Sequence, residues 1–120
     1  MMKLVLVQGL YYFFTGIWPI LHIESFVAVS GPKQDIWLVK TVGVLITVIG
    51  ATMLVHYFSR RKKPFKEIAF MAIASAMGFI LIDTYYALVD RIWDVYLLDA
   101  VAQLILLISW LILIRKKALI

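Results

Sequence analysis

Two acidic residues lie inside stretches of the chain that are otherwise apolar, and their position makes them candidates for chemistry. Asp83 follows fifteen uncharged residues, 68–82, and Asp99 precedes fifteen more, 100–114. If these stretches are antiparallel helices, each acid lies about 22 Å from the same membrane surface, at a rise of 1.5 Å per residue. Ionisable groups at such depth are costly in lipid and indicate a functional site.

Neighbouring polar residues extend the two acids into a candidate ligand-binding site. Tyr86 lies three residues after Asp83, and Gln103 lies four residues after Asp99. This spacing places each neighbour on the same helix face as its acid. Lys40, expected near one membrane boundary, and His22, expected at the same end, complete the set. The candidate site comprises Asp83, Asp99, Gln103, Tyr86, Lys40 and His22.

The chemistry of this site depends on how the two carboxyl groups are compensated. Two carboxyl groups that meet in a low dielectric do not both ionise readily unless a cation offsets them, and Lys40 could be that cation. Such a site fits binding of a lipid or small amphiphile, proton-coupled transport, or acid–base catalysis. The alternative is that both acids reach interfacial water and pair with Lys40 or tyrosine hydroxyls to fix packing.

No metal or cofactor is expected. The chain contains no cysteine, which excludes disulfide frameworks, thiolate zinc sites and iron–sulfur clusters. His22 and His56 are expected at opposite ends of the membrane, so they cannot share a metal ion. Nucleophile-elbow, phosphate-loop and zinc-protease motifs are missing from the sequence. These observations favour a binding protein over an enzyme and predict no catalytic residue.

The elements that position these residues are four apolar segments. Of the 120 residues, 64% are hydrophobic and 16% are charged. A soluble domain has about 45–50% apolar residues, so much of this chain must be solvated by lipid. Each segment is long enough to cross about 30 Å of hydrocarbon. The sequence therefore predicts an all-α, antiparallel four-helix membrane bundle that forms a single domain, with helices at about 4–23, 36–58, 68–89 and 95–114.

Basic residues are distributed unevenly between the two ends of this bundle. Nine of the 12 lie on the side of the termini, which predicts that both termini are cytoplasmic. Formal charge is +8 on that side and −3 on the other, so the net charge of +5 reports topology and nucleic acid is not an expected partner. The nine are Lys3, Arg60, Arg61, Lys62, Lys63, Lys66, Arg115, Lys116 and Lys117; the other three are Lys33, Lys40 and Arg91.

The basic run between the second and third segments is a weaker candidate site. Arg60, Arg61, Lys62 and Lys63 could hold anionic lipid headgroups. Their simpler role is to set the topology.

Small residues at helical spacing are expected to mediate helix packing. Gly43, Thr47 and Gly50 share one stripe of the second segment. In the third segment, Ala72 and Ala76 are four residues apart, and so are Ala74 and Gly78. Small residues allow the backbones of two helices to approach closely in lipid. We expect these stripes to pack the bundle, with a homo-oligomer contact as the second interpretation.

Two further residues carry specific expectations. Gln8 lies inside the first apolar segment, where it is expected to donate an interhelical hydrogen bond. Trp110 lies near the expected cytoplasmic boundary, where it is expected to join an aromatic belt at the interface.

The first half of the chain carries a resemblance. Gly16-Ile17-Trp18-Pro19-Ile20-Leu21-His22, followed by Gly31-Pro32-Lys33 and Trp37-Leu38-Val39, resembles functionally uncharacterised small bacterial four-helix membrane proteins. The general plan is similar to DoxX-like proteins, without a diagnostic DoxX motif. The resemblance implies a bacterial cytoplasmic (inner) membrane location and transfers no activity. Small multidrug transporters have a comparable length, but they rely on an acid in the first helix, which this chain lacks.

The leading hypothesis is a small membrane protein that binds a lipid or small amphiphile between its helices near the outer leaflet. Membrane lipids are the expected partners. A proton-coupled transporter, a membrane enzyme with an aspartate acid–base group, and a structural or assembly subunit remain as alternatives.

Overall fold

The fold is all-α in the computed structural model, which describes residues 2–60, 62–89 and 92–116. Four of its helices are long and apolar enough to span a membrane, and the fifth is a short helix between the first two of them. The four predicted segments correspond to these long helices, whereas the short helix was not predicted. The elements are α1 (Met2–Leu21), α2 (Ile23–Ser30), α3 (Ile36–Phe58), α4 (Lys66–Leu88) and α5 (Val95–Arg115).

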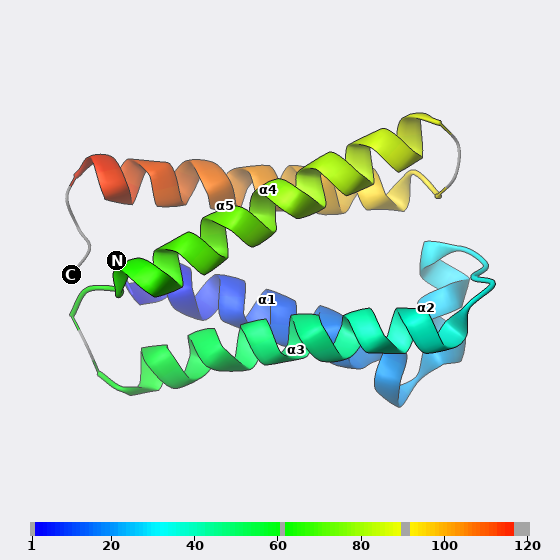
Figure 1. Ribbon diagram of the computed structural model, residues 1–120, viewed down its shortest axis with the longest axis horizontal. Helices are drawn as coiled ribbons and strands as arrows, with labels where there is room; N and C mark the ends of the chain where they lie inside the picture. Colours follow the sequence, from blue (N-terminus) through cyan, green and yellow to red (C-terminus); the bar gives the residue numbers. More distant parts are fainter. Residues whose placement is uncertain (1, 61, 90–91, 117–120) are drawn as a thin grey trace.

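The four long helices alternate in direction (Figure 1). α1 begins and α5 ends at one end of the bundle, which we call the terminal end. The opposite end holds α2, and we call it the α2 end. This arrangement confirms the predicted antiparallel order, which follows from the short connections between consecutive spans.

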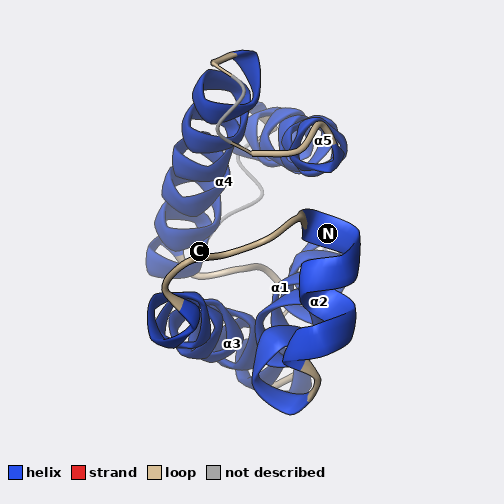
Figure 2. Ribbon diagram, turned by 90° about the vertical axis from the view of Figure 1, so that its right-hand side faces the viewer, coloured by secondary structure: helices blue, strands red, loops and turns tan. Residues whose placement is uncertain are grey.

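The bundle consists of two helix pairs, α1 with α3 and α4 with α5 (Figure 2). Glycines allow the closest approach within the first pair. A methyl group added to Gly16 would lie 2.7 Å from the carbonyl oxygen of Gly43, and one added to Gly50 would lie 2.7 Å from that of Gly9. The predicted packing role of Gly43 and Gly50 is therefore confirmed. The bundle-packing role predicted for Ala74 and Gly78 is wrong, because both residues are exposed and a methyl group added to Gly78 would meet nothing within 4 Å.

A buried hydrogen-bond network joins the two pairs near the terminal end. Gln8 of α1 donates from Nε2 to the carbonyl oxygen of Ala72 on α4, at 3.1 Å. Its Oε1 accepts from Nε1 of Trp110 on α5, at 2.6 Å. The interhelical role predicted for Gln8 is thus confirmed. The belt position predicted for Trp110 is wrong: its side chain is fully buried, because Gln8 supplies the acceptor that a buried indole N–H requires.

α2 begins where the backbone of His22 leaves helical geometry. The Nδ1 atom of His22 accepts from the backbone N–H of Ser25, at 3.2 Å, so the histidine caps the new helix. Nε1 of Trp18 donates to Oγ of Ser25, at 2.8 Å, and fastens α2 back onto α1.

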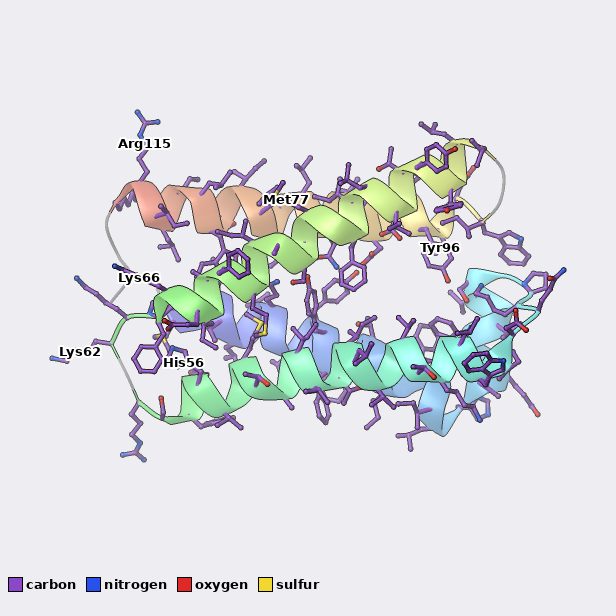
Figure 3. All side chains as sticks on the ribbon, in the orientation of Figure 1. His56, Lys62, Lys66, Met77, Tyr96 and Arg115 are labelled. Atoms are coloured by element: carbon purple, nitrogen blue, oxygen red, sulfur yellow. The ribbon has the colours of Figure 1, made fainter. Side chains whose placement is uncertain are left out.

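Basic side chains gather at the terminal end, where Figure 3 shows Lys62, Lys66 and Arg115 extending from the bundle. Three further basic residues lie outside the described residues: Arg61, Arg91 and Lys117. The location of this end in the cytoplasm remains a prediction.

Single cysteines test this orientation, because the native chain has none. Gln34 lies at the α2 end and Lys62 at the terminal end, and both are exposed. We expect an impermeant maleimide added to intact cells to label Gln34→Cys. Lys62→Cys should remain unlabelled until the membrane is opened. Labelling of Lys62→Cys alone in intact cells would reverse the orientation.

Candidate ligand-binding site

A cavity of about 600 Å³ lies at the α2 end of the bundle. All five helices contribute to its wall, which is mainly apolar. Small-molecule sites in proteins have volumes of roughly 300–1,000 Å³, so this cavity has the size of a ligand site. The tilt of α4 widens this end, since α4 ends farther from α3 than it begins (Figures 1 and 2).

Apolar residues on α3 and α4 line the cavity and are also exposed on the surface of the bundle. Leu38 and Val42 of α3 line it and are 44% and 48% exposed, while Ile82 of α4 lines it and is 55% exposed. All three are apolar residues of candidate membrane spans, so their exposed surfaces fit contact with lipid chains. An apolar molecule in the bilayer can therefore reach the cavity sideways.

Asp83 of α4 forms the most unusual part of the cavity wall. The residue is only 4% exposed. Its Oδ2 atom is the one buried side-chain nitrogen or oxygen of the described residues without a hydrogen-bond partner. Its carboxyl group lies close enough to that of Asp99 to interact with it. Buried polar atoms in native proteins are nearly always satisfied, so this oxygen is available to a hydrogen-bond donor that enters the cavity or to a proton shared with Asp99.

Asp99 of α5, in contrast, is held by donors from the protein. Its Oδ1 accepts from the hydroxyl of Tyr11 on α1 and from Nε2 of Gln103, the latter at 3.4 Å. The Tyr12 hydroxyl donates to Oε1 of Gln103 at 2.7 Å. The two tyrosines of α1 therefore fix the orientation of the Asp99 and Gln103 side chains in the cavity wall.

Lys33 is the basic residue that lines the cavity, among the residues described. Its ammonium group donates to the carbonyl oxygens of Ser30 and Gly31, at 3.0 and 2.8 Å. It also lies over the rings of Tyr96 and Phe26, 5.3 and 5.9 Å from their centroids. Figure 3 shows Tyr96 pointing from α5 toward α2. Burial lowers the pKa of Lys33, because desolvation disfavours its charged form.

The structure brings together three of the six residues of the predicted site. Asp83, Asp99 and Gln103 all line the cavity. The remaining three are exposed and lie outside its lining: these are Tyr86, Lys40 and His22.

Local geometry explains why these three residues lie elsewhere. Lys40 is two residues beyond Leu38, and residues at this spacing do not share a helix face. The ring of Tyr86 packs edge-on against Tyr85, with centroids 5.1 Å apart. His22 caps α2.

The weaker lipid-headgroup candidates lie at the terminal end, far from this cavity. Arg60, Lys62 and Lys63 are exposed there, and Arg61 lies outside the described residues. Their role as a headgroup site stays a prediction.

Sequence reasoning missed Tyr11, Tyr12 and Lys33. One signal for the tyrosines was available, because Tyr11 and Tyr12 lie in the middle of an apolar segment rather than at an interface. A buried tyrosine hydroxyl needs a hydrogen-bond partner. The sequence does not indicate that Lys33 lines the cavity, because its position depends on helix α2, which was not predicted.

The fold and cavity define a class: a small polytopic membrane protein with four candidate spans in the described part of the chain. No family model, curated protein or solved structure matches the sequence. The comparisons therefore identify no family.

Proposed function

We propose that the protein binds a lipid or small amphiphile in the cavity. The apolar chain of the ligand occupies the space between α3 and α4, and its polar group meets Asp83. One observation carries this proposal: a mainly apolar cavity contains a buried carboxyl oxygen, Oδ2 of Asp83, that has no hydrogen-bond partner. An apolar wall with few polar groups is typical of ligand pockets.

We further propose that the terminal end faces the cytoplasm of a bacterial inner membrane. The surplus of basic residues at that end supports this orientation. The α2 end then faces outward, and the cavity takes its ligand from the outer leaflet.

The hydrogen-bond pattern favours binding over proton-coupled transport. Polar contacts extend from Asp99 through Gln103 and Tyr12 toward the middle of the bundle. Farther toward the terminal end, Trp110 donates to Gln8. An indole N–H is a donor only, so Trp110 cannot accept a proton and pass it to the terminal end.

A cavity-filling substitution tests the proposal, with 1-dodecanol as the probe in phosphatidylcholine nanodiscs. Val42 lines the cavity and is 48% exposed, whereas Val44 is 49% exposed and lies outside the lining. We expect saturable stabilisation of the native protein, reaching about 2.7 kcal/mol when free dodecanol is 100 times its Kd. Val42→Trp should abolish the stabilisation, and Val44→Trp should retain it. Equal responses from the two tryptophan variants would contradict binding in the cavity.

A further inference from the structure

The acidic wall of the cavity, formed by Asp83 and Asp99, contains a free hydrogen-bond acceptor. Among the described residues that line the cavity, no basic side chain pairs with either acid. Oδ2 of Asp83 accepts no hydrogen bond. Lys33 also lines the cavity, but its ammonium group donates to the carbonyl oxygens of Ser30 and Gly31 and, at 3.3 Å, to Oγ of Ser30. Two neighbouring carboxyl groups thus make this wall electronegative.

Aromatic rings surround the same space. Six of them line the cavity, from α1, α2, α4 and α5. The faces of aromatic rings attract cations within about 6 Å. The ammonium group of Lys33, which lies over Phe26 and Tyr96, shows that two of these rings already hold a cation. The six are Tyr11, Tyr12, Trp18, Phe26, Phe79 and Tyr96.

We propose that the ligand is an amphiphile with a protonated amine as its headgroup. This inference rests on the proposed function and specifies its ligand class. The N–H groups of the amine donate to Oδ2 of Asp83, and its positive charge offsets the carboxyl groups of Asp83 and Asp99. Hydrogen bonds between ionised partners are roughly twice as strong as neutral ones. A neutral alcohol supplies a donor without the charge.

An anionic headgroup is the competing ligand, and Lys33 would be its partner. Two features disfavour it. The ammonium group of Lys33 already has three acceptors, and the carboxyl groups of Asp83 and Asp99 repel a second anion in the same cavity. Like charges brought together in a low dielectric interact strongly.

The test compares three probes that share one chain: dodecylamine, 1-dodecanol and dodecyl phosphate. Affinities are measured on the native protein in phosphatidylcholine nanodiscs, from the concentration dependence of thermal stabilisation. We expect dodecylamine to bind at least tenfold more tightly than either other probe. Asp83→Asn should remove this preference, so that the variant binds dodecylamine no more tightly than dodecanol. Asp94→Asn is the matched control, because Asp94 is exposed at the start of α5 and lies outside the cavity lining.

The outcomes separate this inference from the proposed function. If dodecanol or dodecyl phosphate binds the native protein as tightly as dodecylamine, the amine headgroup is wrong and binding in the cavity stands. If no probe gives saturable stabilisation, the proposed function fails as well. The comparison of probes uses the native chain, so it decides the headgroup even where Asp83→Asn does not fold.

Discussion

Alanine at Gly50 is expected to destabilise the protein by about 3 kcal/mol or more, because it forces α1 away from α3. The new methyl group would lie 2.7 Å from the carbonyl oxygen of Gly9 and 2.9 Å from Cα of Phe13. Both are backbone atoms of α1, and neither can rotate away. Overpacking a tight interface costs typically about 1–3 kcal/mol and sometimes more. We expect a cost at the upper end of this range, because the clashing atoms belong to the backbone.

Gly78→Ala is the control for this prediction. Gly78 also lies in the interior of a spanning helix, but a methyl group there meets nothing within 4 Å. Unfolding by titration with a denaturing detergent in bicelles should leave Gly78→Ala as stable as the native protein or slightly more stable, because alanine favours the helix. Equal stabilities of the two alanine variants would contradict the packing of α1 on α3.

Leucine at Gln8 is expected to cost about 2 kcal/mol or more. The change keeps a side chain of similar size but removes the acceptor of the Trp110 indole N–H, which is fully buried. It also removes the donor to Ala72 on α4. A buried donor left without a partner costs about 1–3 kcal/mol, and the two lost bonds loosen the contact between the helix pairs.

The matched change is Gln34→Leu, at an exposed position before α3. The same detergent titration should show a much smaller effect there, within about 0.5 kcal/mol of the native protein, as is usual for surface substitutions. If Gln8→Leu is no less stable than Gln34→Leu, then the network of Gln8 and Trp110 does not join the helix pairs.

Much of the fold could be predicted because lipid imposes strong local constraints. A segment in hydrocarbon must satisfy its own backbone hydrogen bonds, so a long apolar stretch reads as a helix. Gly43 and Gly50 could be assigned to packing for a similar reason, because close approach requires small residues. α2 escaped prediction, since its start depends on a cap formed by the side chain of His22.

The candidate site was partly predictable. Asp83 and Asp99 were recognised from their matched depth, which requires only a count of residues along two antiparallel helices. That Lys33 lines the cavity and Lys40 does not depends on the rotation of α3 and on the path of the chain through α2. These depend on contacts between helices distant in sequence, which local spacing does not determine.

Photo-crosslinking tests the central claim, ligand binding in the cavity, most directly. The probe is a dodecanol with a diazirine on its chain, added to the native protein in phosphatidylcholine nanodiscs and mapped by mass spectrometry. We predict crosslinks at Val42, Phe79 and Ile82, which line the cavity, and we predict that excess unlabelled dodecanol suppresses them. Crosslinks at Val44 and Phe70, which are exposed outside the lining, should persist. Crosslinks that excess dodecanol suppresses equally at all five positions, or at none, would contradict a binding site in the cavity.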